Sequence, residues 1–173
     1  MIASDAHPFC WTGRLREAVR LTDKAVALGP EDQSQVLGFG THRLGLMFRG
    51  SALVEMGRLD EAASDLDRSI DAEQPSSFIW AKAFLVVRAY RAGDASGALT
   101  HARHALERAE GGAPIAQVFA YVVLGIALVA NREWNGAEEA ERRATGACSR
   151  KRPTLRAYSV GTLLPGRGEA RSG

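Results

Sequence analysis

The segment Gly57–Ser69, GRLDEAASDLDRS, decides the fold, because the chain repeats it. A near copy runs over Gly13–Ala25, and weaker copies run over Gly93–Ala105 and Arg132–Ala144. Each copy has alanine at its sixth position and alanine or serine seven residues later. A unit that recurs in this way is typical of a protein built from stacked structural repeats.

Apolar residues in and around these copies follow helical spacing, interrupted by glycine and proline. The pattern predicts helices over Leu15–Leu28, Thr41–Met56, Leu59–Ala72, Phe78–Arg91, Ala95–Ala109, Pro114–Asn131 and Glu133–Ala144. The polar, glycine-bearing segment Glu31–Gly40 is predicted to be mostly loop. Ser76 or Ser77 is the predicted N-cap of the helix that follows them.

The composition favours helices that pack closely. Hydrophobic residues make up 46% of the chain and aromatic residues only 7%, which suits close-packed helices better than a sheet-rich core. We therefore expect an all-α repeat domain over residues 1–146. Residues 147–173 are rich in glycine, proline and basic side chains, and we expect a basic, disordered tail there.

The charge of the chain is divided between these two parts. From Arg150 onward there are six Lys/Arg and one acidic residue, a net charge of +5, whereas the preceding part has 16 Lys/Arg and 19 acidic residues, a net charge of −3. The acidic balance argues against the repeats as a nucleic-acid surface. The tail leaves an alternative function open, which is contact with nucleic acid or another polyanion.

The repeat motifs resemble a known family. The copies are 44, 36 and 39 residues apart, measured between Ala18, Ala62, Ala98 and Ala137. The fourth unit carries Tyr121-x-x-Leu124-Gly125-x-x-Leu128, and the second has Gly50 and the third Val86 where the fourth has Gly125. This pattern resembles the tetratricopeptide repeat, whose units run about 34 residues. The resemblance covers roughly residues 13–145 and implies a right-handed α-solenoid of about three and a half antiparallel helix pairs.

The long, variable spacing is similar to that of divergent tetratricopeptide-like arrays in large bacterial ATPase regulators. These include LuxR-like regulators and class III adenylate/guanylate cyclases with an AAA-type ATPase domain. The segments Leu37–Phe39, Phe48–Gly50, Met56–Leu59 and Asn131–Trp134 most resemble the cyclase-linked group. This resemblance implies a sensory or scaffolding segment of a signalling regulator, with the ATPase or cyclase domains of the same system among its partners. The chain itself carries neither domain.

No residue pattern indicates catalysis. Gly161–Gly168 approaches a phosphate-binding loop, but it has arginine for the required lysine and glycine for the magnesium-holding serine or threonine. His101 and His104 share a helix face without further metal ligands, so we interpret them as surface or boundary residues. Three acids are interpreted as a solvated face: Asp65, Asp67 and Asp71. We expect no enzyme, no metal and no cofactor.

Cysteine usage and hydropathy bear on location. Cys10 and Cys148 form no CxxC motif, and the N-terminus lacks a signal-peptide pattern, so a cytoplasmic setting is expected. The most apolar run, Ile115–Ala130, is 16 residues long and includes Gln117. A membrane span needs about 20 residues. We therefore expect a buried helix there and no membrane partner.

The resemblance also predicts a binding surface. In tetratricopeptide-like arrays the first helix of each pair lines a concave groove, which would bind a protein or peptide. The residues expected to contact that partner are Met47, Trp80, Val87, Tyr90, Arg91, Phe119 and Ile126. Aromatic residues are enriched at binding hot spots, which favours Trp80, Tyr90 and Phe119 as anchors. The same positions are equally compatible with core packing between neighbouring helices.

Overall fold

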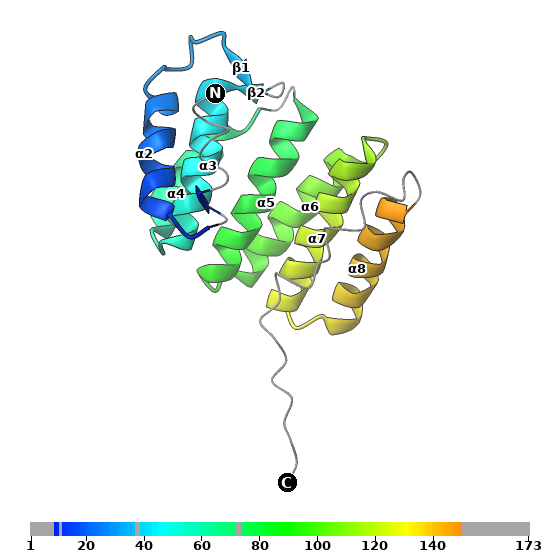
Figure 1. The fold of residues 1–173 in the computed structure, drawn as a ribbon. Helices are drawn as coiled ribbons and strands as arrows, with labels where there is room; N and C mark the ends of the chain where they lie inside the picture. Colours follow the sequence, from blue (N-terminus) through cyan, green and yellow to red (C-terminus); the bar gives the residue numbers. More distant parts are fainter. Residues whose placement is uncertain (1–8, 11, 37–38, 72–73, 150–173) are drawn as a thin grey trace.

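A computed structural model describes residues 9–10, 12–36, 39–71 and 74–149 (Figure 1). Within these ranges, seven helices and one small sheet follow in the order α2 (Leu15–Val26), β1 (Gln35–Val36), β2 (Phe39–Gly40), α3 (Thr41–Glu55), α4 (Leu59–Ser69), α5 (Pro75–Arg91), α6 (Ala95–Ala109), α7 (Pro114–Ala130) and α8 (Trp134–Ser149). The predicted all-α class is confirmed. Residues 147–149 belong to α8, and the rest of the expected tail lies outside the described residues.

The start of α5 differs from the prediction. The helix begins at Pro75 rather than Phe78, and its N-cap is Gln74. Proline fits the first position of a helix, because the N–H that it lacks has no partner there. The predicted N-cap at Ser76 or Ser77 is therefore wrong, since both residues already lie inside the helix.

The segment predicted to be mostly loop before α3 contains a short antiparallel pair of strands. β1 and β2 pair Gln35 with Gly40 and Val36 with Phe39. The side chains of Val36 and Phe39 pack against a buried cluster that includes residues of α3. The strands are held by this apolar contact, since two residues per strand are too few to be stable alone.

Four turns in the chain share one backbone geometry, the Schellman motif. Each has one residue with a positive φ: Gly13 (75°), Gly57 (76°), Gly93 (73°) and Arg132 (61°). The next N–H donates to the carbonyl five residues earlier, as from Arg58 to Leu53 at 2.9 Å. Glycine adopts this left-handed conformation freely, whereas Arg132 carries a side chain there.

The helices pack in sequence order. Each one from α3 to α7 packs against the helices before and after it, and α2 and α8 pack against α3 and α7 (Figure 1). In addition, α3 packs against α5, and α5 against α7. Among the described residues, α4, α6 and α8 make at most marginal contact with one another. The helices α3, α5 and α7 thus lie closer together than α4, α6 and α8 do.

Small residues make the contacts between successive helices. The repeated alanine or serine positions of the first three copies are 0–1% exposed: Ala18, Ala25, Ala62, Ser69, Ala98 and Ala105. Glycine permits a still closer approach. A Cβ placed on Gly45 of α3 would lie 2.8 Å from the Cβ of Ala25, and one placed on Gly50 would lie 2.7 Å from Cγ of Leu66. Larger side chains there would push the helices apart.

The apolar helix α7 is packed but not enclosed. It contacts α5, α6 and α8, yet only Ala120, Val123 and Ala127 are buried. Most of its other side chains are half-buried, and Ile115 is 51% exposed. Within the described ranges, no helix combines the length and the apolarity needed to cross a bilayer.

Asp65 corrects the prediction of a solvated acidic face, because it is buried at 5% exposure, whereas Asp67 is exposed. Arg49 of α3 donates from Nε and Nη2 to the Asp65 carboxylate at 2.6 and 2.8 Å. Its Nη1 donates to Asp23 of α2 at 2.9 Å. The hydrogen bonds that Arg49 donates to Asp65 raise the pKa of Arg49 above its ordinary value. This ion network ties α2, α3 and α4 together.

Candidate binding surface on α3, α5 and α7

One face of α5 carries three of the seven residues predicted to bind a partner. Trp80, Phe84, Val87 and Arg91 follow one another at intervals of three or four residues, so they share a helix face. We call these four residues the α5 stripe. The first three are half-buried and Arg91 is exposed. The stripe therefore combines partial packing with surface that a partner can reach.

Aromatic rings connect the stripe to α7. The ring centroid of Trp80 lies 4.4 Å from that of Phe119 in α7 and 6.5 Å from that of Phe84, with tilted planes. Aromatic pairs in such geometry contribute about 0.5–1.5 kcal/mol beyond the area they bury. Trp80 thus helps to hold α5 against α7, and only part of its indole is open to a partner.

The C-terminal end of the stripe is polar. Nη2 of Arg91 donates to Oε2 of Glu55 in α3 at 2.6 Å, and the two side chains remain 42% and 41% exposed. Tyr90 precedes Arg91 and is 43% exposed. Exposed ion pairs contribute at most about 1 kcal/mol, so this pair can exchange partners at little cost. The end of the stripe therefore offers a phenol, a guanidinium and a carboxylate to a polar ligand group.

Met47 is the one predicted contact residue that lies in the core. It is 2% exposed and packs with Leu44 and Phe48 of α3. The cause is that Ala25 of α2 and Trp80 of α5 close over this part of α3 from two sides. We correct the expectation for Met47 accordingly, since it offers no surface to a partner.

The remaining predicted contact residues are intermediate in solvent exposure. Val87, Phe119 and Ile126 are half-buried, and each packs against a different buried cluster. The sequence pattern did not single out Phe84, which packs beside Trp80 and Val87 on the stripe. An aromatic residue one helical turn after Trp80 is the signal that could have identified it.

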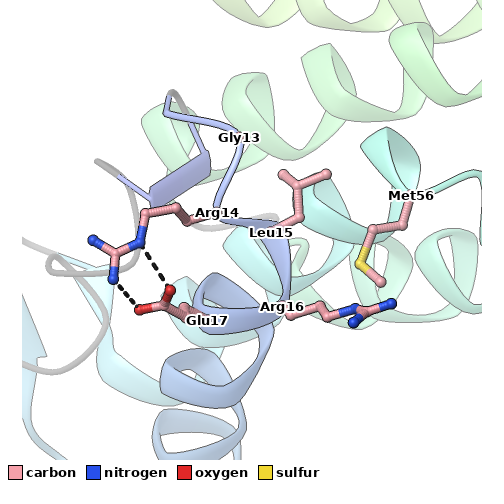
Figure 2. A pocket seen from close by; sticks show the side chains of 6 residues that line it. All are labelled: Gly13, Arg14, Leu15, Arg16, Glu17 and Met56. Carbon is pink, nitrogen blue, oxygen red and sulfur yellow. Dashed lines mark hydrogen bonds and ion pairs between the residues drawn. The ribbon is translucent and has the colours of Figure 1, made fainter.

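A separate hollow of about 430 Å³ lies at the start of α2 (Figure 2). Its lining consists of Gly13, Arg14, Leu15, Arg16, Glu17 and Met56. Glu17 accepts hydrogen bonds from Nε and Nη2 of Arg14 at 2.8 and 2.5 Å. Figure 2 shows this pair on the side of the hollow opposite Met56. Because the only carboxylate is already paired, the lining offers no base beside a nucleophile.

Burial shifts the pKa of two further titratable groups. Burial raises the pKa of the Cys10 thiol to about 11, so the unreactive thiol form predominates near neutral pH. Burial also lowers the pKa of His101 in α6, whose enclosed Nδ1 has no hydrogen-bond partner. In the part of the chain that the structure describes, no three His, Cys, Asp or Glu side chains are grouped to hold a metal ion.

Comparisons with models of protein families, with curated proteins and with solved structures each returned no match. The residues of this chain alone therefore define the candidate binding surface. Their arrangement can bury apolar area against a partner, with hydrogen bonds at one end, which is the chemistry of macromolecular recognition.

Proposed function

We propose that this chain is a noncatalytic protein-interaction module of the tetratricopeptide-like type, which binds a protein or peptide along α3, α5 and α7. One observation carries the proposal. The fully packed side of α5 includes Leu85 and Val86, which are 2% and 0% exposed, yet the apolar residues of the α5 stripe stay half-buried. These side chains pack against the core on one side and leave the rest of their apolar surface outside it, next to the exposed Tyr90.

The helix contacts support a curved stack. The succession α3, α5, α7 is in direct contact, whereas α4, α6 and α8 are nearly separate in the described part of the chain. Unequal spacing of this kind is expected when helix pairs stack into a solenoid whose first helices line the concave side. The proposed array has about three and a half pairs, of which α2 is the second helix of the first.

The chemistry of the surface favours an amphipathic segment as the partner. Trp80, Phe84 and Val87 would receive its apolar side chains, and the Arg91–Glu55 pair would receive a polar or charged group at one end. Recognition of extended or helical segments by apolar grooves with polar rims is a recurring mode. The motif resemblance extends the proposal, since the ATPase or cyclase domains of a signalling regulator would supply such a segment.

The test begins with peptides selected from a random display library against the whole chain. Binding of a selected peptide is then measured by calorimetry for the wild type and for Tyr90→Ala. We expect about a tenfold loss of affinity, because truncation of a hot-spot aromatic costs about 1–2 kcal/mol. Tyr90 is preferred to Trp80 for this purpose, since Trp80 also packs against Phe119 and its loss would disturb the fold.

Leu28→Ala is the matched control. Leu28 is 48% exposed, close to the 43% of Tyr90, but it follows the end of α2 and lies off the proposed surface. Its truncation is expected to leave the affinity unchanged. Equal affinities of the wild type and Tyr90→Ala, or a loss confined to Leu28→Ala, would exclude the proposed surface.

A further inference from the structure

The last described helix is covered on one side only. α4 packs between α3 and α5, and α6 packs between α5 and α7. Within the described residues, α8 packs against α7 and makes no more than marginal contact with any other helix. The face of α8 that corresponds to the second contact of α4 and α6 is therefore open.

This open face has lost the apolar residues of its equivalents. Leu99 of α6 packs against a cluster that contains residues of α7, and Ala102 belongs to that cluster with 0% exposure. In the repeat alignment their equivalents in α8 are Glu138 and Glu141, and both are exposed. A partner helix with only apolar side chains would cover the carboxylates of Glu138 and Glu141 without providing an opposite charge, which is costly.

The charge of the open face is not neutralised within α8. Arg142 and Arg143 both pair with Glu139, at 2.6 and 2.8 Å. Glu138 and Glu141 form no ion pair with any residue that the structure describes. The face is consequently complementary to a segment with several cations.

Trp134 lies at the N-terminal end of this face and is 62% exposed. Its equivalents in the preceding units are covered by the next helix. Arg88 of α5 donates to the carbonyl of Leu59 at 3.1 Å, and Asn131 at the end of α7 donates to the carbonyl of Ala95 at 2.7 Å. A hollow of about 310 Å³ lies beside Trp134 instead. An exposed indole next to carboxylates suits a ligand with apolar and cationic side chains.

We propose that the segment Arg150–Leu164 of this same chain binds the open face of α8. The segment follows α8 directly and has the required chemistry in the required order. Its cations come first: Arg150, Lys151, Arg152 and Arg156. Its apolar residues follow: Tyr158, Val160, Leu163 and Leu164.

The segment is long enough to turn back along α8 and reach Trp134. Trp134 lies 15 residues before Ser149 in α8, which is about 22 Å along a helix. An extended chain covers that distance in about seven residues, and Tyr158 lies nine residues after Ser149. After a turn of about two residues, the segment thus places Arg156 beside Glu138, about one helical turn from Glu141, and its apolar residues at Trp134.

The test uses the full chain with Trp11→Phe and Trp80→Phe, which leaves Trp134 as the only tryptophan. Quenching by acrylamide, which is uncharged, measures the exposure of its indole. Replacing Arg152 and Arg156 by glutamate is expected to raise the quenching constant about twofold, because the covering segment is repelled. Glu138→Lys with Glu141→Lys is expected to do the same. Combining the two sets of reversals restores the original constant.

The control reverses two exposed glutamates elsewhere, Glu107→Lys in α6 and Glu110→Lys at its C-cap, and is expected to leave the constant unchanged. Far-ultraviolet circular dichroism verifies that each variant keeps its helices. A constant that is the same in all variants, or that the combined reversals fail to restore, overturns the proposal. A constant that depends on protein concentration also overturns it, in favour of binding by a second copy of the chain.

Discussion

At the scale of single residues, the second and third helix pairs are each fitted by the combined size of two side chains at one crossing point. Gly50 meets Leu66 in the second unit. In the third unit the equivalent positions hold Val86 and Ala102, which share one buried cluster. A small residue on one helix is thus matched by a larger one on the other, as close packing demands. This match explains why valine can stand where the motif expects a small residue.

Gly50→Ala tests this fit. The new Cβ would lie 2.7 Å from Cγ of Leu66, so we expect a loss of about 1–3 kcal/mol of unfolding free energy from overpacking. Gly125→Ala is the matched control at the equivalent position, where the nearest atoms are 3.8 and 3.9 Å away. It should be neutral or stabilising by up to about 1 kcal/mol, because alanine favours helix. Urea unfolding measures both, and equal effects would refute the packing account.

At the scale of helices, boundaries could be predicted where glycine or a capping residue marks the end of a helix. α6 has the predicted ends because Gly93-Asp94 and Gly111-Gly112 leave little choice, and Asp94 caps it by accepting a hydrogen bond from the N–H of Gly97 at 2.8 Å. The strand pair β1–β2 was not predictable, because two residues per strand show no periodicity. Its position depends on contacts with α3 that no local pattern contains.

The ion network of Arg49 could not be predicted from local sequence patterns either. Asp65 lies three residues after the buried Ala62 and four before the buried Ser69, so its spacing places it on the buried face of the helix. Its charge nevertheless indicated solvent, because its partner lies 16 residues away on another helix. Buried charges are expected only with a partner, and the sequence does not show which partners meet. For the same reason, the sequence could not decide whether Trp80 packs in the core or binds a partner.

Arg49→Met is predicted to destabilise the chain more than Asp65→Asn does. Loss of the arginine leaves the buried Asp65 carboxylate with only the distant Arg68, at 3.9 Å, which costs about 3 kcal/mol. After Asp65→Asn, Arg49 keeps Asp23 and partial exposure, so the expected cost is about 1 kcal/mol. Arg58→Met, which removes only an exposed pair with Glu61, serves as the control and should change nothing measurable. The reverse order in urea midpoints would contradict a buried network.

At the scale of the whole molecule, the half-buried position of His101 in α6 predicts a pH dependence. Burial and the charge of Lys82 lower its pKa, His104 acts in the same direction, and Asp67 and Asp94 act against it. The unfolded chain therefore binds the proton first as the pH falls below about 6.5. The contribution of His101 to stability is present above that pH and is lost as the pH falls toward the lowered folded-state pKa.

His101→Gln separates this effect from those of other groups. Urea midpoints measured between pH 7.5 and pH 5 should fall less steeply for the variant than for the wild type. An identical pH slope in both proteins would show that His101 titrates alike in the folded and unfolded chains. A steeper slope in the variant would mean that the folded state favours the protonated ring.

The account as a whole makes α3, α5 and α7 the surface that binds and leaves α4, α6 and α8 to support it. Hydrogen–deuterium exchange of the full chain, with and without a bound library-selected peptide, tests this division most directly. The account predicts slower backbone exchange in α5 and its neighbours α3 and α7 when the peptide is bound. Slower exchange confined to α4, α6 and α8 would contradict it.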